Sequence, residues 1–326
     1  MIRILNVEPL NYSDEARFIL QSLGQLDERY LTKAELLTCL PDYDVLIVRL
    51  GFQLDRTIID SGLRLKAIVT ATTGLDHIDV TYAEQRGIKV LSLRGETEFL
   101  YSIPATAEHT WALLLAMVRR IPQAYASVIA GAWDRDAFRG HDLRGKRLGI
   151  VGLGRIGEKV ACYGLAFGMI VAAYDPYRSD WPTGVKQCLT LPELLERSDV
   201  LSLHVPLNAE TERLIGRREL ARLPAGAWLI NTSRGGVLDE AALVDALQGG
   251  RLSGAALDVI GGEHQSLLRP LLEYARQHDN LLITPHIGGA TVESMAQTEI
   301  YMARKLHQFL AGLNLAQSDG HKGHRG

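Results

Sequence analysis

The chain has few cysteines, a small net charge and no long hydrophobic run. The three cysteines are widely spaced and form no Cys-x-x-Cys pair, which argues against a disulfide framework and against a thiolate metal site. The first residues alternate as a strand does and lack the apolar core of a signal peptide, and no later run reaches membrane-spanning length. A net charge of -3 provides no bulk attraction to nucleic acid or to an anionic membrane. We therefore expect a cytoplasmic protein without nucleic-acid, membrane or metal partners.

Length and composition indicate a folded protein of two domains. The 326 residues exceed one ordinary domain and allow two sizeable cores. Hydrophobic residues make up 47% and charged residues 22% of the chain, a balance typical of globular proteins.

Apolar, β-branched runs predict two parallel sheets. Six runs alternate with helical patterns in the longer part of the chain and predict a Rossmann-type, doubly wound α/β domain. A shorter series predicts a smaller, flavodoxin-like α/β domain. The expected strands are residues 148–151, 170–174, 200–205, 228–230, 254–257 and 281–284 for the first sheet, and 2–7, 45–49, 67–71 and 89–93 for the second.

The last helical stretch, residues 292–313, follows the sixth strand of the larger sheet and is expected to pack on the N-terminal series. We therefore expect a discontinuous substrate domain of residues 1–103 with 290–326, and a dinucleotide-binding domain of residues 104–289. A helix at 104–120 and a loop at 287–289 would make the two crossings. The tail at 314–326, rich in Gly, His and charge, is expected to be disordered.

A glycine-rich turn lies where the first strand of the larger sheet becomes a helix. Gly152, Gly154 and Gly157 form a G-x-G-x-x-G pattern, with Arg155 and Ile156 inside it. Such glycines give a tight turn, close approach of a pyrophosphate and close helix packing, and the phosphates lie at the helix N-terminus. Asp175 closes the next strand, where a carboxylate accepts hydrogen bonds from ribose hydroxyls and repels a 2′-phosphate. This context favours NAD over NADP and over a glycine turn without a cofactor.

Ionisable residues follow three further strands of the larger sheet. Ligands bind beyond the carboxyl ends of parallel strands, so Arg234, Glu263 and His286 are expected to converge. The Arg234 guanidinium matches a carboxylate bidentately. His286 exchanges protons near neutrality, and Glu263 would favour its imidazolium form. Asp258 is placed to fix a nicotinamide carboxamide. Taken singly, each residue also has a structural explanation: a surface ion pair, a packed histidine or a solvated carboxylate.

These motifs resemble the D-isomer-specific 2-hydroxyacid dehydrogenases over about residues 40–300, closest to phosphoglycerate dehydrogenases that lack a regulatory domain. The resemblance rests on residues 152–157, Arg234 in Asn-Thr-Ser-Arg-Gly-Gly, Glu263 after Ala-Leu-Asp-Val, and His286 in Thr-Pro-His-Ile-Gly-Gly. It implies catalytic roles for Arg234, Glu263 and His286, a homodimer built around the helix near 104–120, and a cleft that closes over the substrate. It also implies cofactor contacts from His204, Pro206, Thr232, Asp258 and Gly288.

The substrate side of the expected cleft departs from many relatives, in the loops at 94–101 and 260–264. Arg49 and the turn at Thr73 and Gly74 are candidates to bind substrate, whereas Arg94 reads equally well as solvated. We expect an NAD-dependent oxidoreductase that interconverts a D-2-hydroxy acid and its 2-keto acid, with the side chain of the acid undetermined. The alternatives are an NAD-sensing, corepressor-like binding protein, or a phosphite or formate dehydrogenase.

Overall fold

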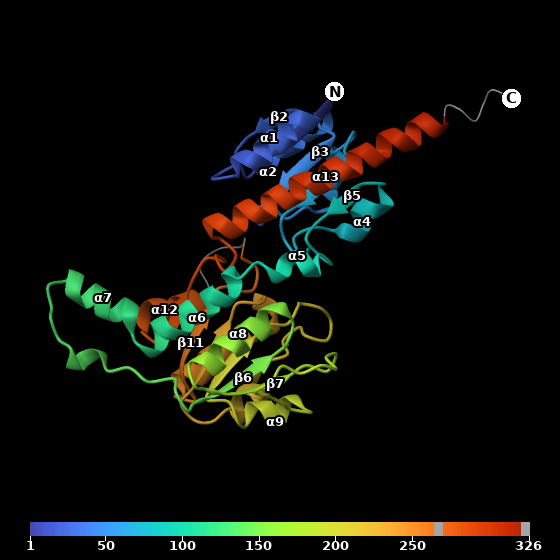
Figure 1. Cartoon of the computed structure of the whole chain (residues 1–326). Helices are drawn as coiled ribbons and strands as arrows, with labels where there is room; N and C mark the ends of the chain where they lie inside the picture. Colours follow the sequence, from blue (N-terminus) through green and yellow to red (C-terminus); the bar gives the residue numbers. More distant parts are fainter. Residues whose placement is uncertain (264–269, 321–326) are drawn as a thin grey trace. The chain divides into compact units, whose positions relative to one another are not determined.

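The computed structural model describes residues 1–263 and 270–320, with side chains described as far as residue 313. The chain divides into two compact units, one formed by Met1–Leu100 with Thr291–Gly326 and the other by Tyr101–Ala290. Each unit is built on its own parallel sheet with helices around it (Figure 1). The predicted pair of α/β folds is confirmed.

The first unit contains a five-stranded sheet in the order β2-β1-β3-β4-β5, with every neighbouring pair parallel. This is the flavodoxin-like order, in which the chain reverses direction across the sheet at the β1/β3 pair. Of the three inner strands, β3 and β4 are buried along their whole length, as expected for strands covered on both faces. The strands are β1 Ile2–Asn6, β2 Gly24–Glu28, β3 Val45–Val48, β4 Ala67–Thr70 and β5 Lys89–Leu91.

Side-chain caps start the helices of this unit. Ser13, Thr32, Asp55 and Asp79 each accept a hydrogen bond from a backbone N–H of the following turn, which satisfies donors that a helix start leaves free. The long C-terminal helix α13 lies beside α1 (Figure 1). The helices are α1 Asp14–Leu23, α2 Lys33–Cys39, α3 Arg56–Ser61, α4 Val80–Gln85, α5 Thr97–Tyr101 at the unit boundary, and α13 Val292–Gly320.

The second unit contains a seven-stranded parallel sheet in the order β12-β11-β10-β9-β6-β7-β8. The order reverses at the β6/β9 pair, which is where doubly wound sheets bind ligands beyond the strand ends. The strands are β6 Arg147–Val151, β7 Ile170–Tyr174, β8 Val185–Gln187, β9 Val200–Leu203, β10 Ala227–Asn231, β11 Leu252–Leu257 and β12 Leu281–Ile283.

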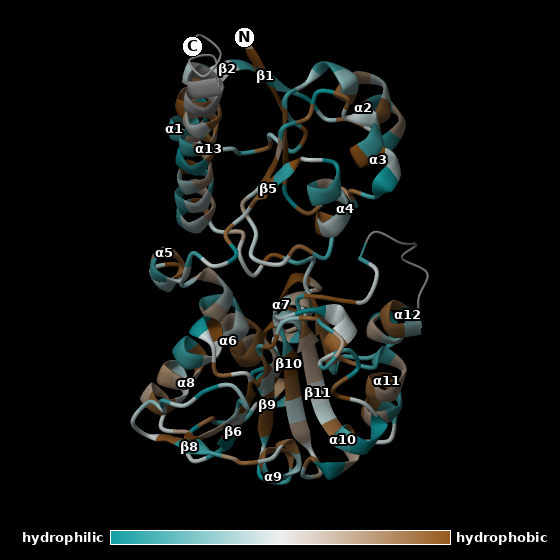
Figure 2. Ribbon diagram, turned by 90° about the vertical axis from the view of Figure 1, so that its right-hand side faces the viewer, coloured by the Kyte–Doolittle hydropathy of each residue, from teal (hydrophilic) through white to brown (hydrophobic). Residues whose placement is uncertain are grey.

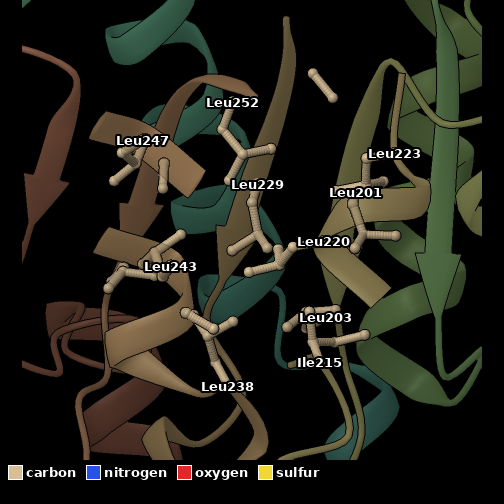
Figure 3. Packing of buried hydrophobic residues seen from close by; sticks show 14 of the residues in the cluster. Leu201, Leu203, Ile215, Leu220, Leu223, Leu229, Leu238, Leu243, Leu247 and Leu252 are labelled. Atoms are coloured by element: carbon tan, nitrogen blue, oxygen red, sulfur yellow. The ribbon is translucent and has the colours of Figure 1, made fainter. Parts of the chain in front are cut away.

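Alternate side chains along the strands of this sheet pack into two hydrophobic cores, one on each face. In β10, Leu229 joins the core under α10 and α11, whereas Trp228 and Ile230 join the core under α6 and α8. Figure 3 shows the first core, a layer of leucines from β9, β10 and the covering helices. Figure 2 shows the matching hydropathy, with brown along β9 and β10 and teal over α10. The helices are α6 Ala105–Val118, α7 Ile121–Ile129, α8 Arg155–Ala166, α9 Leu191–Leu195, α10 Arg217–Arg222, α11 Glu240–Gln248 and α12 Pro270–Gln277.

The sequence reading missed two edge strands and shortened the last helix. The strands β2 and β8 have the sequences GQLDE and VKQ, too polar to show alternation, and each pairs with one neighbour only. The expected disorder from residue 314 was wrong up to Gly320, because α13 continues to that residue. The added segment, residues 314–320, contains no proline to interrupt the helix. Residues 321–326 lie outside the described residues.

Candidate active site

The three glycines of the turn after β6 meet three different environments. Gly152 has φ 86, and a Cβ on it would lie 2.6 Å from the backbone oxygen of His204. A Cβ on Gly157, in the first turn of α8, would lie 2.1 Å from the Gly152 oxygen. The chain's own packing therefore requires glycine at both positions. A Cβ on Gly154 would have no described atom within 4 Å, so this backbone faces open space. The turn has the form of a pyrophosphate cradle.

Asp175, at the end of β7, is hydrogen-bonded to the glycine turn. Its carboxylate accepts hydrogen bonds from the backbone N–H groups of Leu153 at 2.9 Å and Tyr177 at 3.0 Å. Arg178 donates to the backbone oxygen of Leu153, and its guanidinium lies 3.0 Å from the Glu158 carboxylate of α8. Both backbone polar groups of Leu153 are thus held by one loop, and the charge of Arg178 is already paired.

Four other predicted cofactor contacts lie around the same strand ends. His204 follows β9, and its Nε2 is 2.7 Å from the Ser202 hydroxyl. Burial lowers the pKa of His204 to about 3, so the ring is neutral. Pro206 lies two residues further along this loop. At the start of α8, burial lowers the pKa of Arg155, while the Ile156 side chain packs against the core under α6 and α8.

The predicted site residues follow three adjacent strands. Arg234 comes after β10, Asp258 directly after β11, and His286 after β12. The Nδ1 atom of His286 is 2.7 Å from Oε2 of Glu263, and the two side chains are 24% and 27% exposed. Because Nδ1 of His286 is hydrogen-bonded to the Glu263 carboxylate, Nε2 is the ring nitrogen that could exchange a proton with a ligand. His286 also has φ 56, a left-handed backbone that is rare for a non-glycine residue and is concentrated at functional sites.

Close backbone packing holds the Arg234 loop against the Glu263 loop. A Cβ on Gly235 would lie 2.0 Å from the carbonyl carbon of Ile260, so only glycine fits there. The N–H of Gly261 donates to Glu240 at 2.5 Å, which ties the second loop to the start of α11. Arg234 itself is extended, with φ -146 and ψ 141, and donates to the neighbouring Ser233 oxygen. The structure therefore brings these two loops together beyond β10 and β11.

Asp258 is buried beneath this rim, with its side chain 1% exposed. Its carboxylate accepts from the N–H groups of Ile287 at 2.9 Å and Gly288 at 2.7 Å, and from the Thr284 hydroxyl at 2.6 Å. The Nε2 atom of His109, on α6, lies 3.2 Å from the same carboxylate. His109 is not among the residues predicted from the sequence. Asp258 therefore organises the turn that carries His286.

The hydroxyl of Thr232, another predicted cofactor contact, shares a 2.8 Å hydrogen bond with Thr110 of α6. This places Thr232 within the same polar layer between the sheet and α6, directly after β10. Gly288, also predicted, is held by Asp258, and a Cβ on it would lie 2.9 Å from the Asp258 carboxylate. Both residues thus lie at the strand ends that carry Arg234, Asp258 and His286.

The substrate candidates of the first unit follow β3 and β4. Arg49 pairs with Glu299 of α13, donates to the Leu10 oxygen at 3.0 Å, and is 20% exposed. Thr73 and Gly74 lie in the turn after β4, where the Thr72 hydroxyl donates to the Gly74 oxygen at 2.8 Å. The positive charge of Arg49 is therefore already compensated within its own unit.

The departing loop at 94–101 also packs within the first unit. Phe99 stacks on Tyr301 of α13 with ring centroids 4.1 Å apart. Glu96 accepts hydrogen bonds from Tyr301 and Lys305 of the same helix. Arg94 is exposed, with its N–H donating to the Ser92 hydroxyl at 3.3 Å. The loop is thus anchored to α13. Of residues 260–264, His264 lies outside the described residues.

The described part of the chain contains neither a cluster suited to a metal ion nor a single membrane-spanning helix. Among residues 1–263 and 270–320, no group of three or more His, Cys, Asp or Glu side chains is arranged to hold a metal ion. Within the same ranges no single helix is long and apolar enough to cross a membrane. The segments Thr97–Val118 and Ile121–Ile129, bent by 62°, meet the length and composition criteria only as a pair.

Comparison with known proteins places these features among named relatives. Residues 111–288 match the family described as D-isomer specific 2-hydroxyacid dehydrogenase, NAD binding domain. A D-3-phosphoglycerate dehydrogenase of Methanocaldococcus jannaschii is 39% identical over 316 residues, which cover 96% of this chain and 58% of that protein. A hydroxypyruvate reductase of Thermotoga maritima is 38% identical over 300 residues, which cover 91% of this chain and 95% of that one. The chain thus spans little more than half of the first relative and nearly all of the second.

Solved structures are similar over the whole chain. A D-lactate dehydrogenase of Aquifex aeolicus, crystallised with NAD and lactic acid, superposes with a TM-score of 0.82 at 31% identity and covers 98% of both chains. The TT0316 protein of Thermus thermophilus superposes with a TM-score of 0.83 at 36% identity, covering 95% of this chain and 97% of that one.

Proposed function

Because the chain belongs to the D-isomer specific 2-hydroxyacid dehydrogenase family, we propose that it interconverts a D-2-hydroxy acid and its 2-keto acid with NAD as cofactor. The observation that carries this proposal is the 2.7 Å contact between His286 and Glu263 beside the Arg234 loop. Oxidation of a hydroxyl group requires a base that removes its proton. Formate has no such hydroxyl proton, and the paired histidine therefore favours a hydroxy acid.

The glycine turn and its surroundings fit a dinucleotide. Gly154 leaves open space where a phosphate would approach, at the N-terminus of α8, and Asp175 lies beside it at the end of β7. We assign the pyrophosphate to the residues 152–157 and the adenosine ribose to Asp175. Bound NAD supplies the acceptor for a hydride, and NADH the donor.

Substrate binding and proton transfer are assigned to Arg234, Glu263 and His286. Arg234 presents a planar guanidinium that binds the substrate carboxylate bidentately and polarises the carbonyl group. Glu263 holds the His286 ring through Nδ1. In reduction His286 gives the proton from Nε2 to the developing alkoxide, and in oxidation it removes the hydroxyl proton. Arg234, Glu263 and His286 are thus the proposed catalytic residues.

The two units take separate roles in this proposal. Residues 104–289 bind the dinucleotide, and residues 1–103 with 290–326 form the substrate domain. The backbone N–H groups of Thr73 and Gly74 are proposed to bind the substrate carboxylate from the first unit. Arg49 remains a candidate for a second anionic group, although its pairing with Glu299 lowers the charge that it offers. The relatives' names point to phosphoglycerate or hydroxypyruvate as the acid.

The test is a steady-state assay with a panel of acids. The purified chain is expected to oxidise NADH with hydroxypyruvate or pyruvate, or to reduce NAD with D-3-phosphoglycerate, and His286→Asn should abolish turnover while NADH still binds. NADH binding without turnover of any acid would contradict the dehydrogenase and favour an NAD-sensing protein. Turnover of phosphite or formate alone would replace the substrate class.

We also propose a homodimer that forms through α7. The helix Ile121–Ile129 contains no buried residue and projects from its unit (Figure 1). Four large apolar side chains on it and Trp133 beyond it are 46–89% exposed, a patch typical of an interface. The wild type should sediment as a dimer and Ile129→Glu as a monomer, whereas Phe18→Glu, an exposed control on α1, should not change the mass. The exposed residues are Ile121, Tyr125, Val128, Ile129 and Trp133.

A further inference from the structure

His109 lies in the polar N-terminal part of α6, between Glu108 and Thr110. Its side chain is 16% exposed, and Nε2 lies 3.2 Å from Oδ1 of Asp258 and 3.1 Å from the hydroxyl of Thr284. The α6 neighbours Trp111 and Leu114 are buried in the hydrophobic core, so the helix is a firm support for the ring. This contact joins α6 to the ends of β11 and β12.

The hydrogen-bond donors determine the state of the His109 ring. The Thr284 hydroxyl donates its only hydrogen to Asp258 at 2.6 Å, so its oxygen accepts from His109. The carboxylate of Asp258 only accepts. Nε2 of His109 must therefore carry a hydrogen, which it directs at both oxygens.

Asp258 connects His109 to the turn that contains His286. Its carboxylate accepts from the N–H groups of Ile287 and Gly288, and its backbone oxygen accepts from the N–H of His286 at 2.8 Å. The turn from Thr284 to Gly288 is therefore held in place by hydrogen bonds to Asp258. That turn holds His286 at φ 56, a conformation that persists only where the surroundings fix it.

We propose that His109 is a positioning residue for His286. By donating to Asp258 and Thr284, His109 fixes the carboxylate that holds the strained turn, and through it fixes the direction of the His286 ring toward the substrate. This inference rests on the proposed function for its effect on turnover, but the effect on the turn itself does not. The role resembles that of the outer hydrogen-bond partners that orient metal-bound histidines.

The first test is independent of turnover. His109→Leu removes the donor, so the amide hydrogens of Ile287 and Gly288 should exchange with solvent roughly tenfold faster, since a tenfold change corresponds to about 1.4 kcal/mol of opening free energy. His109→Gln can place an amide N–H near the same oxygens and should restore most of the protection. His278→Leu is the matched control, because His278 stacks on Tyr274 in the same unit. Wild-type exchange in His109→Leu would overturn the proposal.

The second test measures the chemistry. His109→Leu should lower kcat for keto-acid reduction roughly 10- to 100-fold, as loss of outer-shell partners does elsewhere. KM and the Kd for NADH, measured by fluorescence titration, should change less than about twofold. The solvent deuterium isotope effect on kcat should rise because proton delivery becomes limiting, and His109→Gln should recover most of the rate. An unchanged isotope effect with loss of NADH binding would show a merely structural role and contradict the proposal.

A wild type that turns over no acid would contradict the proposed function alone. In that case the exchange measurement still decides the role of His109, because it reports the turn directly.

Discussion

At the carboxyl edge of each sheet a carboxylate contacts a basic side chain, but the two pairs are exposed to different degrees. In the seven-stranded sheet, His286 and Glu263 are 24% and 27% exposed. In the five-stranded sheet, Arg49 is 20% exposed whereas Glu299 is only 1% exposed. The first pair can meet a ligand and exchange a proton. In the second pair the Glu299 carboxylate is buried in the core.

The buried pair explains what charge does in the smaller unit. Glu299 accepts from the Ser13 N–H at 2.6 Å as well as from Arg49, which joins α13 to the loop before α1 and to the end of β3. Burial raises the pKa of Glu299 even though Arg49 and Ser13 oppose the shift. Desolvation offsets much of the attraction between Arg49 and Glu299. The pair therefore fixes the position of α13 more than it adds to the free energy of unfolding. On the edge of the smaller sheet, therefore, charge has a structural role.

Removing the cation of the buried pair should have the largest effect. Arg49→Ala leaves Glu299 without its counter-charge and should lower the free energy of unfolding at pH 7 by about 3–5 kcal/mol. Because the folded pKa of Glu299 lies above its unfolded value, stability is lost as pH rises through that range and is regained on acidification. Urea titrations at pH 4.5 and pH 7 measure both effects.

The double variant Arg49→Ala with Glu299→Gln separates charge from packing. A neutral amide retains hydrogen bonds, so this variant should recover much of the lost stability. If Arg49→Ala is as stable as wild type and instead raises KM for the keto acid, the comparison fails and Arg49 belongs to the substrate site.

The second prediction concerns the exposed edge. Arg234→Lys removes the planar fork and should lower kcat/KM for the keto acid by about two to three orders of magnitude, with NADH binding nearly unchanged. The measurement is steady-state kinetics together with fluorescence titration of NADH. Arg218→Lys, on α10, is the control and should behave as wild type. Near wild-type kcat/KM in Arg234→Lys would remove this residue from the site.

The difference between the edges also explains what the sequence could predict. Arg234, Asp258 and His286 directly follow apolar runs that reveal their strands, so their convergence is readable from topology alone. The family and its NAD-binding domain are confirmed by the match at residues 111–288. By contrast, Arg49 and Glu299 are 250 positions apart, and no local pattern joins them.

Other features were invisible for local reasons. A lone histidine in a helix is usually a packed residue, so His109 carried no functional signal until its contact with Asp258 was seen. The edge strands β2 and β8 lack the apolar alternation that marks a half-buried strand. Long-range pairing and edge position are properties of the fold and leave little trace in a short window of sequence.

Another pair, Arg178 with Glu158 beside the glycine turn, is 15% and 30% exposed. Wild type should prefer NADH strongly, and Asp175→Ser should weaken NADH by roughly 10- to 100-fold, the worth of hydrogen bonds to a charged group. NADPH should improve in the same variant, but only modestly while Glu158 holds Arg178. Adding Glu158→Gln should free the guanidinium and raise NADPH binding further.

The measurement is kcat/KM for both cofactors, with Kd from fluorescence. Asp180→Asn is the control, because it alters another partner of Arg178 and leaves Glu158 in place. Equal use of NADH and NADPH by the wild type would show that Asp175 does not face the ribose.

His204 shows the effect of desolvation on a titratable ring. Its Nδ1 is buried and has no hydrogen-bond partner within the described residues, and its pKa is lowered to about 3. Between that value and the ordinary value of 6.5 the unfolded chain binds a proton that the folded chain does not. Stability should therefore fall with decreasing pH in this window, by up to about 1.4 kcal/mol per pH unit. His204→Asn should flatten the slope of unfolding free energy between pH 6.5 and pH 4, whereas His307→Asn, on the exposed side of α13, should leave it as in wild type. An identical slope in wild type and His204→Asn would show that the ring takes up its proton without unfolding.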